Sequence, residues 1–273
     1  MLHSVRARDD SFDMKRLEEL TKAVCAIARQ AGVYIAGERK RFEEERVERK
    51  HAHDYVSYVD KGSERLIVEA LKDLLPEAGF VTEEGLADYH NEQFCWVVDP
   101  LDGTTNFIHQ FPPYCVSIAL CRGHNILLGV VYEVTTAQCY SAWQGGGAWC
   151  NGLRLDVSRH ALGDALLCLQ LPYNSEAYSP VVKHLIETFY GRAASVRMMG
   201  SAAMALCYVA EGKLDGYMEK YIGRWDYMAG ALIVQEAGGC VTDYEGNDDF
   251  TQGNSVVATN SVIHQELLQA VKG

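Results

Sequence analysis

Acidic side chains at the ends of predicted strands and helices are the groups in this sequence best suited to chemistry. Residues 96–107 read W-V-V-D-P-L-D-G-T-T-N-F, so an apolar strand ends at Asp99, turns at a proline and offers a second carboxylate at Asp102. These two carboxylates and the Leu101 carbonyl could converge on one point, and Mg²⁺ prefers such hard oxygen donors. Taken alone, a D-x-x-D sequence is more often a surface turn in which Asp99 caps the next helix.

Residues near this turn in the sequence could contribute to the same cation site or bind an anion beside it. Gly103, Thr104 and Thr105 open a short predicted helix, where backbone N–H groups and hydroxyls could hold a phosphate oxygen. Glu83 and Glu84 follow a short strand, and adjacent carboxylates repel one another unless they are solvated or bridged by a cation. A glutamate pair by itself is usually the solvated start of a helix.

Two further aspartates lie at predicted element boundaries. Asp226 follows Trp225 and precedes an apolar helix, where an N-cap role is the simpler interpretation. Asp60 starts the second predicted helix and is also a plausible cap. Each acid is weak support by itself. Five or six acids at element ends in a mixed α/β chain together predict a divalent-metal cluster.

Hydrophobic spacing predicts the elements that must position these acids. Helices are expected over residues 14–39, 60–75, 180–190, 201–211, 226–237 and 261–271. Strands are expected over residues 79–82, 94–98, 115–121, 126–134, 138–143, 165–171, 194–198, 214–219, 239–242 and 256–258. The three strands within residues 115–143 predict a meander, and the charged run 42–50 fits a solvated face or an edge strand. With no Pro-rich or Ser-rich linker, the pattern predicts a layered α/β or α+β body with two closely packed halves.

Composition narrows the class of protein. Lys and Arg number 25 and Asp and Glu 37, so the net charge of −12 disfavours generic nucleic-acid binding. An anionic substrate would then need a local cation. Nine cysteines without a C-x-x-C pair fit reduced thiols in a cytosolic protein. No apolar run approaches the roughly 20 residues that span a bilayer, so we expect a cytoplasmic protein without membrane contact.

Several motifs resemble the signatures of the inositol monophosphatase family, which comprises Mg²⁺-dependent, lithium-sensitive phosphatases. W-V-V-D-P-L-D-G-T-T-N-F is similar to the first signature and W-D-Y-M-A-G-A-L-I-V-Q-E-A-G-G to the second. D-Y-V-S-Y-V-D, E-E-G, G-G-G-A-W-C-N-G and G-S-A-A occur in the family's order. The resemblance runs from about residue 14 to the C-terminus.

The resemblance implies a fold and a domain organisation. The fold would be α+β, a layered α-β-α-β-α sandwich. Residues 1–13 would be a flexible lead-in, and residues 14–273 one catalytic unit. That unit would have an N-terminal α/β half to about residue 155 and a C-terminal α/β half from about residue 156. Family members are commonly homodimers, so a homodimer is expected.

Carried over position by position, the resemblance implies the following site. Two or three Mg²⁺ ions would be held by Glu83, Asp99, the Leu101 carbonyl, Asp102 and Asp226. Asp60, Thr104 and Glu83 would be the catalytic residues, with Thr104, polarised through Asp60, helping to activate a metal-bound water. Substrate would be bound by Gly103, Thr104, Thr105, Gly200, Ser201, Ala202, Glu219 and Asp226. Gly103, Thr104 and Thr105 would hold the phosphate, and Glu219 the ring hydroxyls, although Glu219 could instead form a structural ion pair.

The implied reaction is the hydrolysis of myo-inositol monophosphate by direct in-line attack of water. A phosphate monoester dianion repels hydroxide and hydrolyses extremely slowly, and two cations would relieve that repulsion. The same chemistry on histidinol phosphate, a sugar phosphate or a nucleotide 3′-phosphate is the alternative. A non-catalytic protein that kept the fold is a third hypothesis, which the retained acids disfavour.

Three positions depart from the family's usual pattern or are ambiguous. Thr82 stands where many relatives have glycine, and Val59 where a threonine or alanine-like residue is common. Neither removes a predicted ligand. Arg224, two residues before Asp226, could contact a second anionic group of the substrate or pair with Glu219, and these outcomes point to different substrates.

Overall fold

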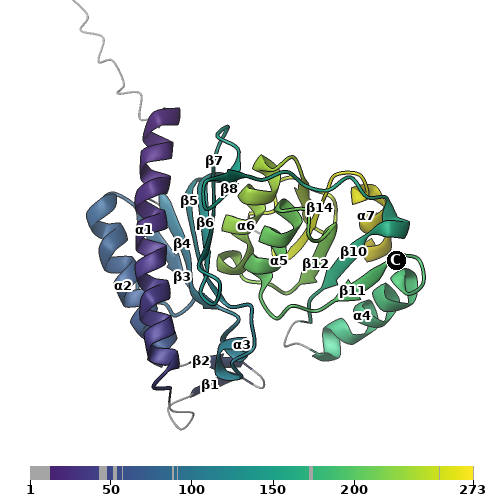
Figure 1. Ribbon diagram of the computed structural model, residues 1–273, viewed down its shortest axis with the longest axis horizontal. Coiled ribbons are helices and arrows are strands. Elements are labelled where there is room, and N and C mark those ends of the chain that lie inside the picture. Colours follow the sequence, from purple (N-terminus) through teal and green to yellow (C-terminus); the bar gives the residue numbers. More distant parts are fainter. Residues whose placement is uncertain are drawn as a thin grey trace, which may run out of the picture.

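The chain folds into five layers in the order α-β-α-β-α, an α+β sandwich (Figure 1). The computed structural model describes residues 13–42, 48–51, 54–56, 58–87, 89–90, 92–171, 175–251 and 253–272. Residues 1–12 of the expected lead-in therefore lie outside the described residues. The layered architecture inferred from the family resemblance is confirmed.

The first outer layer consists of α1 (Met14–Arg39) and α2 (Tyr58–Leu74). Helix α1 has the predicted bounds and starts at Asp13, whose side chain accepts a hydrogen bond of 2.7 Å from the Arg16 backbone N–H. Such a cap satisfies one of the unpaired N–H groups in the first turn. Helix α2 begins two residues before the predicted position and ends ahead of Pro76, which lacks the N–H needed to continue it.

The second layer is a seven-stranded sheet in the order β3-β4-β5-β6-β7-β8-β9. Its strands are β3 (Gly79–Thr82), β4 (Cys95–Asp102), β5 (Cys115–Arg122), β6 (Asn125–Glu133), β7 (Gln138–Trp143), β8 (Ala148–Cys150) and β9 (Leu153–Arg154). Strands β3 and β4 are parallel, and β5, β6 and β7 form the predicted antiparallel meander. A separate two-stranded sheet joins β1 (Glu48–His51) to β2 (Asp54–Val56). The charged run thus ends in a strand, while residues 43–47 lie outside the described part of the chain.

Strand β4 differs from the prediction in a way that matters for the site. The sequence suggested that the strand stops before a Pro-Leu turn, but β4 continues to Asp102 with an irregular register. Asp99 pairs with Ser117 and Asp102 with Cys115, so three steps along β4 match only two along β5. This extra residue is a β-bulge. In a regular strand, residues three apart face opposite sides. The bulge therefore allows both aspartates to face the same side.

The central layer contains α5 (Ala202–Ala210) and α6 (Arg224–Glu236), which lie between the two sheets (Figure 1). Both are buried along most of their length because apolar layers cover them on both sides. A side chain at Gly129 of β6 would place its Cβ only 2.6 Å from the carbonyl oxygen of Ala229. Glycine at this position therefore lets the backbone of α6 approach the first sheet.

The fourth and fifth layers complete the sandwich. The second sheet has the order β11-β10-β12-β14-β13 and mixes parallel with antiparallel pairs. Its strands are β10 (Leu166–Leu169), β11 (Ser195–Arg197), β12 (Gly216–Lys220), β13 (Cys240–Thr242) and β14 (Ser255–Thr259). Its outer face is covered by α4 (Ser175–Phe189) and α7 (His264–Lys272). Helix α4 starts five residues before the predicted residue 180, because Pro180 lies inside the helix and not at its first position.

The two sheets are joined by a segment that contains one 3-10 turn, η2 (Leu162–Asp164). Strand β9 ends at Arg154 and β10 begins at Leu166, so the proposed division near residue 155 would fall between the sheets. Within the described ranges, no helix has both the length and the apolar character required to cross a bilayer.

Candidate metal centre

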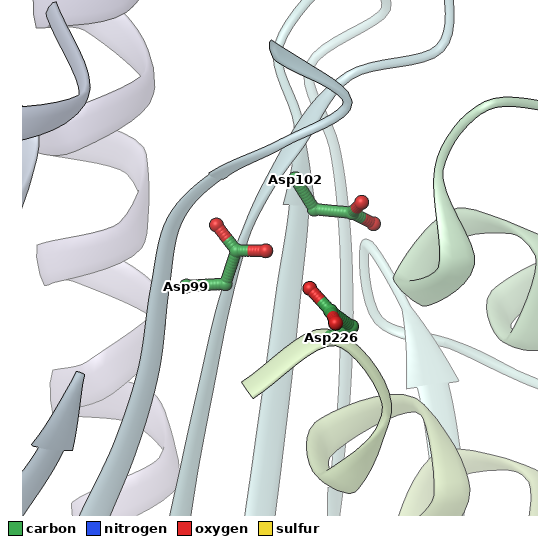
Figure 2. A group of neighbouring side chains, drawn as sticks. All are labelled: Asp99, Asp102 and Asp226. Carbon is green, nitrogen blue, oxygen red and sulfur yellow. The ribbon is translucent and has the colours of Figure 1, made fainter. Parts of the chain in front are cut away.

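Three aspartates that are far apart in the sequence meet between the first sheet and α6. Asp99 and Asp102 come from the end of β4, and Asp226 comes from the first turn of α6 (Figure 2). One carboxylate oxygen from each lies within 4.8 Å of the others. This spacing is suited to one or more small cations with oxygen ligands.

Asp99 is almost completely buried. Its Oδ1 accepts a hydrogen bond of 2.9 Å from the backbone N–H of Leu101 across the bulge. Burial raises the pKa of Asp99 well above its usual value, and the negative charges of Glu83 and Asp102 raise it further. Without a cation, ionised Asp99 is therefore strongly disfavoured.

Asp102 is held by the N-terminus of α5. Its Oδ2 accepts hydrogen bonds from the Ser201 hydroxyl at 2.6 Å and from the Ala203 backbone N–H at 2.8 Å. Burial raises the pKa of Asp102 to about 6, and these hydrogen bonds oppose the increase. The resemblance had implied that the Ser201 hydroxyl contacts substrate, but Ser201 is fully buried and donates to Asp102.

Asp226 is the third residue of α6 and does not occupy the N-cap position that the simpler interpretation gave it. Gly223 is the N-cap, and its backbone N–H donates to Oδ2 of Asp226 at 2.8 Å. Burial raises the pKa of Asp226 well above its usual value, and the charge of Asp102 adds to the increase. Three mutually repelling acids thus share one low-dielectric space, which is the environment that a bound divalent cation stabilises.

Glu83 lines the same pocket as the three aspartates. It is not part of the group whose oxygens lie within 4.8 Å of one another, although its charge raises the pKa of Asp99 and Asp226. The loop that carries Glu83 is held by hydrogen bonds to Glu64 of α2, which is fully buried.

Glu64 was missed by the sequence analysis. Its carboxylate accepts hydrogen bonds from the Thr82 hydroxyl at 2.8 Å, the Glu84 N–H at 2.9 Å and the Leu86 N–H at 2.8 Å. Thr82, which the sequence analysis singled out as a departure, therefore contributes to this anchor. One signal was present in the sequence: Glu64 lies in the apolar stripe of α2, where an acid needs buried partners.

A pocket of about 380 Å³ opens over the acidic cluster. Its lining includes most residues of the predicted site, namely Glu83, Asp99, Leu101, Asp102, Gly103, Thr104, Thr105, Gly200, Ala202, Glu219 and Asp226. The structure places Asp60 behind Thr104, where it is fully buried. The Thr104 hydroxyl donates to Asp60 Oδ1 at 2.8 Å and lies 3.1 Å from the Leu101 carbonyl oxygen.

The part of the pocket lined by Gly103 depends on a tight backbone turn. Gly103 has a φ of 88°, and a Cβ there would lie 3.1 Å from the carbonyl oxygen of Pro113. Glycine is therefore favoured at this position. Asn106 of α3 (Thr104–Ile108), which the sequence analysis also missed, donates to the carbonyls of Pro113 at 2.8 Å and Met199 at 2.9 Å. It thereby ties α3 to the loop that carries Gly200.

Glu219 and Arg224 line different cavities. Glu219 of β12 lines the pocket, accepts a hydrogen bond from the Tyr217 hydroxyl, and has its pKa raised to about 8 by burial. Arg224 lines a different cavity with Cys95 and Cys121. Among the ion pairs of the described residues, none joins Arg224 to Glu219. Neither alternative raised for Arg224 is therefore supported.

Residues 16–273 match the model of the inositol monophosphatase family. An inositol-1-monophosphatase of Mesorhizobium japonicum is 41% identical over 80% of this chain and 83% of that protein. A protein of Vibrio cholerae named Nus factor SuhB is 35% identical over 90% of this chain and 92% of that protein.

The fold is also similar to that of solved structures. The crystal structure of the extragenic suppressor protein suhB from Bartonella henselae superimposes with a TM-score of 0.87 and 34% identity. The match covers 93% of this chain and 98% of the other. Sequence and fold therefore indicate the same relationship over nearly the whole described structure.

Proposed function

The chain belongs to the inositol monophosphatase family, whose members are metal-using phosphatases of phosphate esters, and on this premise we propose that it hydrolyses myo-inositol monophosphate. The products would be inositol and phosphate, and the metal would be Mg²⁺. The observation that carries the proposal is the meeting of Asp99, Asp102 and Asp226 within 4.8 Å in a pocket that also contains Glu219.

The residues present fit a divalent metal. The group offers hard carboxylate oxygens, which suit Mg²⁺ better than softer transition metals. Burial raises the pKa of all three aspartates, so a bound cation would favour their ionised forms. We propose that two or three Mg²⁺ ions are held by Glu83, Asp99, the Leu101 carbonyl, Asp102 and Asp226. When bound, such ions supply Lewis acidity and neutralise charge on the phosphate and the leaving oxygen.

The protein's own groups have separate tasks in this proposal. Because the Thr104 hydroxyl donates a hydrogen bond to Asp60, its oxygen can accept a hydrogen bond from the attacking water and orient it. The backbone N–H groups of Gly103, Thr104 and Thr105 would hold the phosphate in line with that water. No cysteine or histidine is among the described residues that line the pocket, so we propose that water attacks phosphorus directly. Glu83 would assist as the third catalytic residue.

The polyol end of the substrate would lie against the opposite wall. Glu219, which is oriented by the Tyr217 hydroxyl, and Asp226 both line the pocket. Their carboxyl groups could form hydrogen bonds with ring hydroxyls, while Gly200 and Ala202 shape the pocket around the ring. Ser201 is assigned a different task, the positioning of Asp102.

Phosphate release from a panel of esters tests the proposal. The panel contains myo-inositol 1-phosphate, histidinol phosphate, a sugar phosphate and a nucleotide 3′-phosphate, each with Mg²⁺ and with a chelator. We expect Mg²⁺-dependent release, greatest from the inositol ester, that is lost in Asp99→Asn and retained in Asp164→Asn, whose side chain is exposed. Preference for another ester would contradict the inositol assignment. No release from any ester by the folded protein would contradict phosphatase chemistry and support the binding-protein hypothesis.

The expected partners and location are also proposals. We propose a homodimer from the family resemblance, a cytoplasmic location from the nine cysteines without a C-x-x-C pair, and no nucleic-acid partner from the net charge of −12. The absence of a membrane partner is proposed because no helix of the described residues could cross a bilayer. Sedimentation of the full chain tests the dimer. Binding of mixed-sequence RNA at low ionic strength that survives 0.2 M salt would contradict the absence of a nucleic-acid partner, since generic attraction to phosphates falls steeply with salt.

A further inference from the structure

Tyr221 lines the pocket over the acidic cluster with a strained backbone. It directly follows β12, the strand that carries Glu219, and its φ is 63°. A positive φ is a genuine outlier for a bulky side chain. Among the described residues, five other than glycine have a positive φ, and of these only Tyr221 is aromatic and only Tyr221 lines this pocket. The strain therefore coincides with the site.

The strained turn is held in place by the neighbouring strand. The backbone N–H groups of Tyr221 and Ile222 both donate to the carbonyl oxygen of Asn254, at 2.6 Å and 3.2 Å. Asn254 immediately precedes β14, which pairs with β12. Glycine would make the same turn without strain. The turn itself thus does not require a tyrosine, and such strain is typically retained where a residue serves function.

Two neighbours brace the Tyr221 ring. Its centroid lies 5.9 Å from that of Tyr178 of α4, with the two ring planes at 78° in an edge contact. Tyr178 is buried, and its hydroxyl lies 2.7 Å from that of Tyr244. The ammonium nitrogen of Lys220 lies 5.7 Å from the centroid of the Tyr221 ring. Tyr221 nevertheless remains 41% exposed, so a ring in a fixed position offers surface to a ligand in the pocket.

The pocket combines acidic and apolar walls. Its buried acids include Asp99 and Glu219, whereas Leu171, which also lines it, is half-exposed like Tyr221. Hydroxyl groups suit the acids, and an apolar surface suits the leucine and the tyrosine ring. A saturated ring alcohol offers both, because its hydroxyls lie at the rim and its C–H groups form two faces. A short acyclic alcohol has no such face.

We propose that Tyr221 is a specificity-determining residue whose ring packs against the C–H face of a saturated ring alcohol. It thereby favours phosphate esters of cyclic polyols over esters of acyclic ones. The inference rests on the proposed phosphatase function and goes beyond it by naming the residue that selects the ring. Because the contact is made to the alcohol and not to the phosphate, it is equally strong in the ground state and the transition state. Such a contact lowers KM and leaves kcat unchanged.

Steady-state kinetics with Mg²⁺ on myo-inositol 1-phosphate and on glycerol 3-phosphate tests the proposal. In Tyr221→Ala, we expect the KM for the inositol ester to rise roughly 2–10-fold, the range of an aromatic contact, with kcat as in the wild type. The KM for the glycerol ester should stay the same. Tyr221→Phe keeps the ring and should behave as the wild type does. Tyr190→Ala is the matched control, since Tyr190 is 86% exposed and does not line the pocket.

Thermal unfolding separates the strain from the ring contact. Tyr221→Ala and Tyr221→Gly both lose the ring, but only glycine adopts a positive φ without strain. Tyr221→Gly should therefore unfold about 2–4 °C above Tyr221→Ala. Its KM for the inositol ester should nevertheless be raised as in Tyr221→Ala. Equal unfolding temperatures of the two variants would contradict the strained turn on which the inference is based.

The kinetic outcomes distinguish failure of this inference from failure of the proposed function. If the wild type releases phosphate but Tyr221→Ala has an unchanged KM, or an equal rise in KM for both esters, only the inference is overturned. A fall in kcat at constant KM would show that Tyr221 merely supports the site, and would overturn it as well. Equal losses in Tyr221→Phe and Tyr221→Ala would assign the effect to the hydroxyl and not to the ring face. If the folded wild type releases phosphate from no ester, the proposed function fails, and this inference fails with it.

Discussion

The Thr104 hydroxyl donates a hydrogen bond of 2.8 Å to Oδ1 of Asp60, joining the first residue of α3 to the first turn of α2. Asp60 is fully buried, and 44 residues separate it from Thr104 in the sequence. The contact fixes the direction of the one hydroxyl proton, so the oxygen of Thr104 is presented to the pocket as an acceptor.

Replacing this hydroxyl tests its proposed role in orienting water. Thr104→Val keeps the shape of the side chain and removes the acceptor, so we expect kcat to fall by about 10²–10⁴-fold, the usual range for a lost proton-transfer or orienting group. The substrate KM should change far less. Thr135→Val, in an exposed turn, is the matched control and should leave kcat unchanged. A Thr104→Val enzyme with wild-type kcat would remove Thr104 from the mechanism.

Glu64 supports the loop that carries Glu83. In Glu64→Gln, one oxygen becomes an N–H₂ donor facing backbone N–H groups, so the loop after β3 loses part of its anchor. We expect the affinity for Mg²⁺ to fall roughly 10–100-fold, as is typical when a partner of a metal ligand is removed. Titration calorimetry measures this change. Glu69→Gln, on the exposed face of the same helix, should bind Mg²⁺ as the wild type does, and an equal affinity in both variants would contradict the prediction.

Glu219 should make the metal-free protein less stable as pH rises. Burial raises its pKa from 4.5 to about 8, so the unfolded chain releases the proton at a lower pH than the native protein. Between these two values the native state binds more protons, and the free energy of unfolding therefore falls with increasing pH. Below about pH 4.5, Glu219 is protonated in both the native and the unfolded state, so it no longer makes the free energy of unfolding depend on pH.

Chemical denaturation with chelator present measures this dependence. From pH 5 to pH 8, the wild type should lose stability relative to Glu219→Gln, which cannot ionise. Glu187→Gln, on the exposed face of α4, should follow the wild type at every pH. If the free energy of unfolding changed with pH equally in the wild type and in Glu219→Gln, Glu219 would not be held protonated by burial.

The packing of α6 against the first sheet depends on Gly129. A methyl group there would meet the Ala229 backbone at 2.6 Å from its carbonyl oxygen, and backbone cannot move aside as a flexible side chain can. We expect Gly129→Ala to lower the free energy of unfolding by about 1–3 kcal/mol. It should also weaken Mg²⁺ binding, because α6 carries Asp226. In Gly37→Ala of α1, the added methyl meets open space, so stability should be equal or slightly higher. Equal stability of the two variants would contradict this account of the packing.

Local patterns in the sequence were sufficient to predict most elements. The apolar period of residues 14–39 gave α1 its bounds, and the β-rich runs within residues 115–143 gave the meander. The bulge between Asp99 and Asp102 could not be predicted, because it depends on the register in which β4 pairs with β5, and hydrophobic patterns do not reveal that register. The sequence analysis expected Asp99 and Asp102 to converge, but through a Pro-Leu turn and not through a bulge within β4.

The candidate site, like the fold, could be predicted only in part from the sequence. The sequence and the family resemblance named the acids that the fold brings together, but not the side chains that hold them. Ser201 was expected to face substrate and is buried against Asp102, because its position at the N-terminus of α5 was set by tertiary packing. Arg224 was expected at the substrate mouth because it lies two residues before Asp226, whereas its side chain lines the cavity beside Cys95.

Anomalous diffraction from crystals grown with Mn²⁺ in place of Mg²⁺ tests the central claim most directly. The account predicts two or three peaks among Glu83, Asp99, Asp102 and Asp226, and their loss in crystals of Asp99→Asn. Phosphate release that continues after complete removal of metal, in a protein whose crystals show no peak at this cluster, would contradict it.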